Sequence, residues 1–253
     1  MILTKSASEI ERMRASGRIV AEALRAMADA ITPGKTSTAE LDAIGERVIL
    51  ERGGIPSFKD YRGYPCAVCI SVNDEVVHGI PRPDRVLSAG DIVSLDVGVF
   101  KDGFHADAAW TYPVGKVSGD ARRLLNVARE SLYQGIAQAK AGNRVGHISH
   151  AVQQYVESNG YSVVRDLTGH GIGQKLHEDP SIPNFGKRSS GPGLVPGMTF
   201  CIEPMINAGT WKVRTLEDGW TVVTADGSLS AHFEHTIAVT EDGPVILTVL
   251  DVP

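Results

Sequence analysis

The sequence predicts a mixed α/β (α+β) domain built from two related halves, about residues 1–120 and 121–253. Each half is expected to run helix, helix, strands, and three pairs of motifs recur in the same order. The pairs are His78-Gly-Ile-Pro81 with His170-Gly-Ile-Gly173, Leu87-x-x-Gly90-x5-Asp96 with Leu194-x-x-Gly197-x5-Glu203, and His105-x-Asp107 with His232-x-Glu234. These matches indicate an internal duplication about a pseudo-twofold axis. Because a two-helix half cannot easily bury its sheet alone, we expect one shared core and a single domain, residues 1–253.

The first half begins with two predicted helices. Ser6 or Ser8 is the candidate N-cap, and Glu9 would complete a capping box with Ser6. Apolar residues then follow at helical spacing to Ile31. Ser37 or Thr38 caps a second helix over about residues 39–52. Strands are then predicted over 70–72, 76–79, 91–99 and 104–112, with a hairpin turn at 101–103.

The second half repeats this order. Helices are predicted over about residues 120–139 and from Gly146 or His147 to about Asn159. Strands are predicted over 161–166, 198–206, 221–225, 231–240 and 244–249. The segment around residues 168–173 is rich in glycine and is expected to be a turn.

Composition narrows the class of protein. A hydrophobic content of 42%, a charged content of 22% and a formal net charge of −5 are those of an ordinary globular protein. The negative charge argues against a nucleic-acid surface, although a local basic patch could still contact the ribosome. No apolar run is long enough to span a bilayer, and the first residues do not resemble a signal peptide, so we expect a cytoplasmic protein. The three cysteines fit reduced thiols; Cys66-Ala-Val-Cys69 is interpreted as a buried or pocket-lining strand rather than a zinc or redox site.

Acidic residues within apolar strand segments are the most informative local feature. Asp96, Asp107, Glu203 and Glu234 stand among Val, Ile, Leu and Phe, and His170 stands among glycines. Buried carboxylates cost several kcal/mol unless a cation accompanies them. Few Lys or Arg lie nearby in sequence, so two divalent ions are the expected partners. Four carboxylates and one imidazole suit Mn, Fe or Co, and Zn is a further candidate.

The first predicted hairpin shows how two of these carboxylates could meet. A turn near residues 101–103 places Asp96 opposite Asp107 or one diagonal away, with Cβ atoms roughly 4.5–8 Å apart. Strand alternation directs Val93, Leu95 and the following odd-numbered valines to one face and Asp96 to the other. Two carboxylates at this separation repel each other unless a cation lies between them.

Six motifs together resemble a known family. They are Leu95-Asp-Val-Gly98, Asp102-Gly-Phe-His-Ala-Asp107, Gly169-His-Gly-Ile-Gly173, His177-Glu-Asp-Pro180, Phe200-Cys-Ile-Glu-Pro204 and Phe233-Glu-His-Thr236. Over nearly the whole chain this pattern is similar to the type I (bacterial) methionine aminopeptidases. The resemblance implies the pita-bread fold, with an antiparallel sheet covered by helices on one side. It also implies a cytoplasmic, usually monomeric metalloprotease of the hydrolase class, which removes the initiator methionine of nascent polypeptides before a small second residue.

The resemblance also implies roles for individual residues. Asp107 and Glu234 would bridge the two ions, Asp96 would complete one ion, and His170 with Glu203 the other. A metal-bridging hydroxide would attack the substrate, and Glu203 could carry its proton to the leaving amine. His177 would stabilise the tetrahedral intermediate, and His78 would contact the substrate backbone.

A methionine pocket and a minor cation site complete the expectations. The matching pocket positions are Phe58, Tyr61, Tyr64, Cys69, Leu176 and Trp220. Leu176 stands where the family often has Phe and Phe58 where it can have Cys, and both keep the pocket apolar. Asn73 and Ser230 match a site for one monovalent cation. The remaining histidines, His105, His147, His150, His232 and His235, are interpreted as structural or surface residues, and His235 could support a ligand.

Two other functions remain open from sequence alone. The same fold could serve another substrate, such as an X-Pro peptide, in which case proline-containing products would be released in preference to methionine. A non-catalytic binding module, for instance on the ribosome, would not need the five retained candidate ligands.

Overall fold

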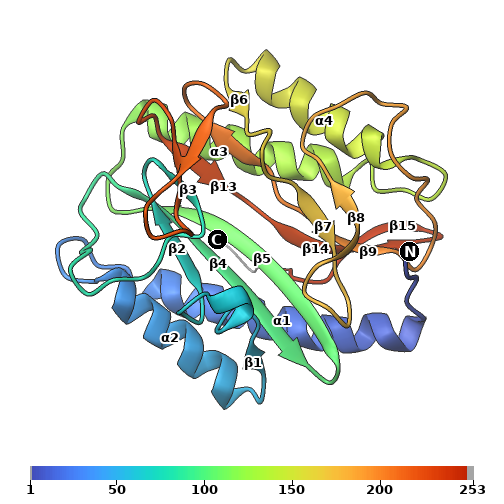
Figure 1. The fold of residues 1–253 in the computed structure, drawn as a ribbon, viewed down its shortest axis with the longest axis horizontal. Helices are drawn as coiled ribbons and strands as arrows, with labels where there is room; N and C mark the ends of the chain where they lie inside the picture. The colour runs from blue at the N-terminus through green and yellow to red at the C-terminus, as the bar shows by residue number, and fades with distance from the viewer. Residues whose placement is uncertain (1, 250–253) are drawn as a thin grey trace.

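The computed structural model describes residues 2–249, which form two pairs of helices around antiparallel strands (Figure 1). The helices are α1 (Ala7–Asp29) and α2 (Thr38–Glu51) in the first half, and α3 (Gly119–Ile136) and α4 (Val145–Ser158) in the second. The predicted order of helix, helix, strands is therefore confirmed in both halves. Helix starts also follow the sequence, since Ser6 with Glu9 and Ser37 with Glu40 each form a complete capping box.

The strands form four small sheets. A four-stranded sheet contains β1 (Ile55–Pro56), β2 (Cys69–Val72), β4 (Ile92–Lys101) and β5 (Phe104–Pro113). A five-stranded sheet has the order β15 (Gly243–Ile246), β14 (His235–Thr240), β9 (Thr199–Ile202), β7 (Gly169–Gly171) and β8 (Glu178–Ile182). Two three-stranded sheets contain β13 (Ser230–His232), β10 (Met205–Asn207) and β6 (Ser162–Val163), and β11 (Val213–Thr215), β12 (Val222–Thr224) and β3 (Glu75–Val77). A short 3₁₀ helix, η1 (Tyr61–Gly63), follows β1.

The long hairpin of β4 and β5 is the centre of the first half. Lys101 pairs with Phe104, so the turn consists of Asp102 and Gly103 alone, both at positive φ, as a tight two-residue hairpin requires. Helix α1 packs against both strands. The odd-numbered residues of β4 from Val93 to Val99 join Val20, Leu24 and other apolar residues of α1 in one buried cluster. The opposite face of the hairpin is thereby left for Asp96 and its neighbours.

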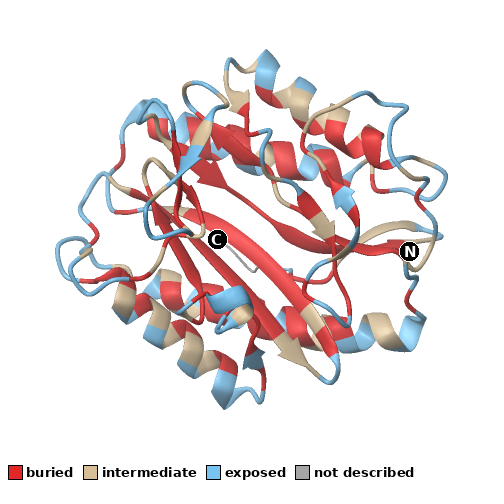
Figure 2. Cartoon of the chain, viewed as in Figure 1, coloured by how far each residue is buried: buried red, intermediate tan, exposed pale blue. Residues whose placement is uncertain are grey.

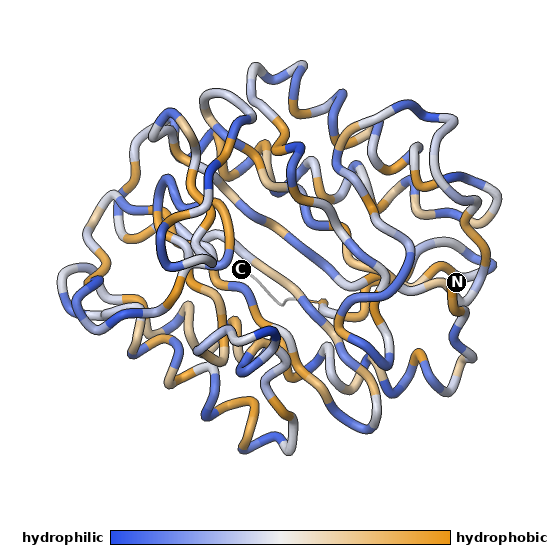
Figure 3. The backbone as a smooth tube through the Cα atoms, in the orientation of Figure 1, coloured by the Kyte–Doolittle hydropathy of each residue, from blue (hydrophilic) through white to orange (hydrophobic). Residues whose placement is uncertain are grey.

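Buried residues from the two halves of the chain pack against one another. Strands β4, β5 and β14 are red through most of their length in Figure 2, and the exposed residues gather on loops and on the outer sides of the helices. Figure 3 shows hydrophilic and hydrophobic residues alternating along the helices, as expected for helices that cover a core. One apolar cluster contains Met13, Phe58 and Phe104 of the first half together with Ile172 and Leu176 of the second. No helix among residues 2–249 is long and apolar enough to cross a membrane.

Candidate metal centre

Asp96 and Asp107 project from the two strands of the first hairpin. Asp96 pairs with Ala109, and Asp107 pairs with Gly98, so the two aspartates are diagonal neighbours, which is one of the two arrangements that the turn predicts. Both are buried, with 8% and 4% of their surfaces exposed. A cross-strand diagonal lies within reach of a shared ion.

Glu203 and Glu234 lie in breaks between strands, and the prediction that each stands within a continuous strand was wrong. Glu203 falls between β9 and β10, and Glu234 falls between β13 and β14. The break leaves the Glu234 backbone free to cross to the other half, where its N–H donates to the Ala109 carbonyl oxygen at 2.8 Å. Two residues further on, the Thr236 hydroxyl donates to the Asp107 carbonyl oxygen at 2.7 Å. These bonds hold Glu234 beside the two aspartates.

His170 lies on strand β7, so the expectation of a turn at residues 168–173 was wrong for its central part. The flanking glycines are needed for close backbone packing: a Cβ on Gly169 would lie 2.3 Å from the Cys201 carbonyl oxygen, and one on Gly171 would lie 2.2 Å from that of Asp179. His170 Nδ1 lies 3.0 Å from the Gly171 carbonyl oxygen, to which it must donate.

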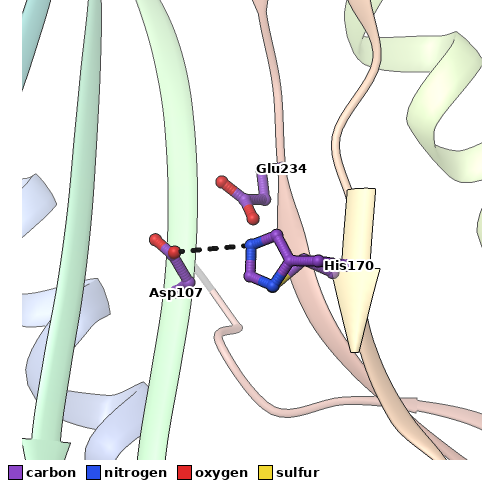
Figure 4. Close-up of side chains that lie close together, drawn as sticks. Asp107, His170 and Glu234 are labelled. Atoms are coloured by element: carbon purple, nitrogen blue, oxygen red, sulfur yellow. Dashed lines mark ion pairs between the residues drawn. The ribbon is translucent and has the colours of Figure 1, made fainter. Parts of the chain in front are cut away.

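The lone pair of His170 Nε2 therefore faces the carboxylates. It lies 3.6 Å from Glu203 Oε1 and 4.0 Å from Asp107 Oδ2. Figure 4 shows the imidazole from β7 and the Asp107 carboxylate from β5 pointing toward each other, with Glu234 above them. Separations of this size leave room for an ion between two donor atoms, each of which would be about 2.0–2.2 Å from it.

The electrostatics of the four carboxylates are unfavourable without a cation. Burial raises the pKa of Asp96 to about 7. Burial, reinforced by neighbouring carboxylates, raises the pKa of Asp107, Glu203 and Glu234 well above the ordinary range. At neutral pH the metal-free cluster would therefore retain protons. Burial also lowers the pKa of His170, which keeps the imidazole neutral and able to act as a ligand.

Unsatisfied oxygens show that this cluster fits metal ions. Asp96 Oδ1, Asp107 Oδ1 and Glu234 Oε1 are buried without a hydrogen-bond partner. Among residues 2–249, no Lys or Arg forms an ion pair with any of the four carboxylates. Buried, unpaired carboxylate oxygens facing a neutral imidazole are the donor set of a divalent-cation site.

Two residues near the centre were not predicted to belong to it. Cys201 Sγ lies within 4.8 Å of ligand atoms of Asp107, His170 and Glu234, and its strand β9 pairs with β14, where Cys201 is opposite Thr236. His232, expected to be structural or at the surface, is 2% exposed, and its Nε2 is unpartnered at 3.9 Å from Glu234 Oε2. The spacing of two residues between His232 and Glu234 was the sequence feature that could have placed His232 near the site.

A cavity of about 220 Å³ opens over the cluster. All five predicted ligands line it, and so do all six predicted pocket residues together with His78 and His177. Trp220 contacts Tyr64 and His78 edge-on, with ring centroids 5.2 Å and 6.3 Å apart. Sequence reasoning missed further lining residues, among them Val77, Leu167 and Met205.

His177 and His78 face this cavity from opposite halves of the chain. The His177 ring lies beside that of His170, with centroids 4.1 Å apart. Burial, followed by His170 and Arg62, lowers the pKa of His177 to about 3. Burial also lowers the pKa of His78. Both imidazoles are therefore neutral near pH 7, and each carries one N–H donor and one lone pair.

Comparisons with known proteins identify the family of this chain. The model of metallopeptidase family M24 matches residues 11–241. Methionine aminopeptidase 1 of Bacillus subtilis is 55% identical, covering 98% of this chain and 99% of its own length. The methionine aminopeptidase of Escherichia coli is 46% identical, over 98% of this chain and 94% of its own length. The chain belongs to metallopeptidase family M24.

Solved structures confirm the fold expected for this M24 chain. The methionine aminopeptidase of Thermotoga maritima superposes with a TM-score of 0.96 at 48% identity, covering 98% of this chain and 99% of that one. The prolidase of Pyrococcus furiosus has a TM-score of 0.79 at 22% identity, covering 98% of this chain and 66% of that one, and shows the shared fold alone. The pita-bread fold and the metallopeptidase class predicted from sequence are therefore confirmed.

The other histidines of this M24 chain have local partners or are partly buried. His105 Nδ1 lies 2.8 Å from the Ser57 hydroxyl, and His235 Nδ1 lies 3.0 Å from the Thr248 hydroxyl. His147 Nδ1 accepts from the Arg144 N–H at the start of α4. His150 is partly exposed on the same helix. All three cysteines are free thiols; Cys69 is buried and lines the cavity, and Cys66 is partly exposed.

Proposed function

We propose that this chain is a methionine aminopeptidase that removes the initiator methionine from nascent polypeptides with a small second residue. One observation carries the proposal: the five candidate ligands and the apolar candidate pocket border the same cavity. Relatives named methionine aminopeptidase, alike over almost the whole chain, support it.

The size and lining of the cavity suit one side chain. Its volume of about 220 Å³ is below the roughly 300–1,000 Å³ of sites for drug-sized ligands. Phe58, Tyr64, Leu176 and Trp220 give it apolar walls, against which an unbranched thioether can adapt its shape. The pocket therefore accepts the methionine side chain while the adjoining peptide bond lies over the carboxylates.

We further propose that two divalent ions, Co, Mn, Fe or Zn, bind the cluster. Asp107 and Glu234 would bridge them, with Asp96 on one side and His170 with Glu203 on the other. The buried oxygens without partners and the raised carboxylate pKa values support this arrangement. When bound, the ions supply Lewis acidity, which polarises the scissile carbonyl and lowers the pKa of the attacking water.

The side chains of this protein supply the remaining chemistry. Glu203, ionised beside the bound cations, takes the proton of the attacking water and gives it to the leaving amine. An N–H of the neutral His177 donates to the carbonyl oxygen as that oxygen gains charge. His78 contacts the peptide backbone from the Trp220 side of the cavity.

A peptide assay tests the proposal. The purified protein, supplied with Mn²⁺ or Co²⁺, is incubated separately with Met-Ala-Ser, Met-Leu-Ser and an X-Pro peptide. We expect methionine release from Met-Ala-Ser, little from Met-Leu-Ser and none from X-Pro. Equal cleavage of both methionine peptides, or of neither, would contradict the proposal. Preferred cleavage of X-Pro would support the alternative substrate class.

The proposal extends to organisation and setting. We take residues 1–253 as one catalytic domain, for which a single calorimetric unfolding transition is expected. We also take the protein as a cytoplasmic monomer that is able to contact the ribosome. A monovalent cation could bind near Asn73 and Ser230. Their proximity supports this, because the Ser230 N–H donates to the Asn73 carbonyl oxygen at 2.9 Å.

A further inference from the structure

The Tyr61 hydroxyl contacts His177 directly. Its oxygen lies 2.9 Å from His177 Nδ1, and the two rings stack with centroids 5.3 Å apart and an interplanar angle of 19°. Among residues 2–249 the hydroxyl has no other hydrogen-bond partner. Tyr61 was expected only to line the methionine pocket, so this bond adds a second contact to its place in the cavity.

The backbone holds Tyr61 in place for this contact. Its neighbours Asp60 and Arg62 both adopt positive φ, at 65° and 51°, a conformation that non-glycine residues adopt only when their surroundings impose it. The Tyr61 N–H donates to the Phe58 carbonyl oxygen at 2.9 Å, and the Tyr64 N–H donates to the Tyr61 carbonyl oxygen at 3.0 Å. The ring is therefore presented to His177 by a tightly bonded turn.

Hydrogen bonding at one imidazole nitrogen decides which nitrogen carries the proton. At His170, Nδ1 donates to the Gly171 carbonyl oxygen and Nε2 is left with a lone pair facing Asp107 and Glu203. At His177 the partner of Nδ1 is a hydroxyl, which can donate. Donation to Nδ1 puts the His177 proton on Nε2, at the opposite edge of the ring.

The two neighbouring imidazoles would then have opposite functions. His170 presents a lone pair to the carboxylate cluster, and His177 presents an N–H. The reverse tautomer of His177 would direct a lone pair into a cavity already bordered by four carboxylates, where it would repel a carbonyl oxygen that gains negative charge. Only the tautomer with the proton on Nε2 assists the reaction.

We propose that Tyr61 is a positioning residue for His177: its hydroxyl donates to His177 Nδ1 and thereby keeps the His177 proton on Nε2, facing the substrate carbonyl. The catalytic consequence rests on the proposed function, whereas the tautomer itself does not depend on any substrate.

Tyr64 provides a matched control within the same pocket. Its hydroxyl lies 3.1 Å from the Val68 carbonyl oxygen and 2.9 Å from that of Gly79, and it is engaged by backbone rather than by an imidazole. Tyr61→Phe and Tyr64→Phe each remove one pocket hydroxyl and keep the aromatic ring. Only the first is expected to affect His177.

The experiment combines nitrogen-15 NMR of the histidine rings with peptide kinetics. In the zinc-loaded protein, which is diamagnetic, we expect His177 Nδ1 to show the shift of an unprotonated, hydrogen-bonded nitrogen and Nε2 that of a protonated one. Tyr61→Phe should move both signals toward a mixture of tautomers, and Tyr64→Phe should leave them in place. On Met-Ala-Ser, Tyr61→Phe should lower kcat about 3- to 10-fold, as expected for one hydrogen bond, and change KM by less than about 2-fold.

Three results are decisive. A wild-type spectrum with the proton on Nδ1 would overturn the proposal. So would unchanged His177 signals in Tyr61→Phe, whatever its kcat. If the spectra behave as expected but no methionine peptide is cleaved, the proposed function fails and the tautomer assignment stands.

Discussion

Removing the metal ions should expose a destabilising contribution of Asp96 that grows as the pH rises, opposite to the behaviour of a carboxylate held in an ion pair. Burial raises the pKa of Asp96 from its model-compound value of 3.8 to about 7. A carboxyl whose pKa is raised by folding is tolerated below its unfolded pKa, where both states are protonated. As the pH rises from the unfolded pKa to the folded pKa, the carboxyl ionises freely in the unfolded state but not in the folded state. The free energy of unfolding therefore falls over this range. In the metal-free protein the Asp96 carboxyl should therefore lower the free energy of unfolding progressively between about pH 4 and pH 7, whereas buried histidines with lowered pKa values, such as His177 and His232, act in the opposite direction.

The size of this effect follows from the shift. A change of about three pKa units corresponds to roughly 4 kcal/mol, a large part of the 5–15 kcal/mol that stabilises a typical domain. For a protein of this length, roughly 4 kcal/mol corresponds to a fall of about 8–16 °C in Tm. Bound divalent cations should cancel the effect, since they favour the ionised carboxylates.

Calorimetry of the chelator-treated protein at pH 5 and pH 8 checks this, with Asp96→Asn as the diagnostic variant. Without metal, Asp96→Asn should be more stable than the wild type at pH 8 by up to roughly 4 kcal/mol and nearly equal to it near pH 4. Asp84→Asn is the matched control, because the Asp84 carboxylate is 79% exposed. This substitution should change the free energy of unfolding by less than about 0.5 kcal/mol. If the stability difference between Asp96→Asn and the metal-free wild type is the same at pH 8 as at pH 5, the electrostatic reasoning is refuted.

Two further predictions concern the ligand set and the loop that carries His177. His170→Ala should lower turnover of Met-Ala-Ser about 100-fold or more and reduce bound metal measured by mass spectrometry; near-full activity with native metal content would refute its assignment as a ligand. Lys5→Met should destabilise the protein by about 3–5 kcal/mol in urea titrations, because it leaves Glu178 buried without its 2.6 Å ion pair. Lys5→Met with Glu178→Gln should recover much of that loss, and a loss below about 1 kcal/mol in the single variant would contradict the argument.

Local chemistry made much of the fold predictable. The alternation from Val93 to Val99 identified the face of β4 that carries Asp96, because strand side chains alternate whatever their surroundings. The start of α1 was predictable because donor and acceptor of the Ser6–Glu9 capping box lie only three residues apart. At α2 the sequence left Ser37 and Thr38 as alternatives, and the structure shows Ser37 as the cap. The predicted turn at residues 101–103 left two placements of the aspartates open, and the observed two-residue turn at Asp102 and Gly103 selects the diagonal one.

Features that depend on distant parts of the chain were not predictable in this way. His170 belongs to a strand only because β7 pairs with β8 and β9, and nothing local in a run of glycines indicates such partners. Cys201 is a single cysteine in its segment, and its sequence context does not indicate a metal site. It lies near the cluster because β9 pairs with β14. Tyr61 looked like an apolar pocket residue, since its hydroxyl partner lies 116 residues away.

The breaks that hold Glu203 and Glu234 have a common origin in the pairing of the second half. Ile202 pairs with His235, and Met205 pairs with His232, so the two residues between them on each chain segment face each other across the same gap. Pro204 has no N–H to donate across this gap, and the bond from the Phe233 N–H to the Pro204 carbonyl oxygen, at 3.3 Å, is long. The interruption releases the Glu234 N–H to bond Ala109 of the other half. Glu203 therefore lies at an interruption of the second-half sheet, whereas its counterpart by sequence repeat, Asp96, lies within a continuous hairpin.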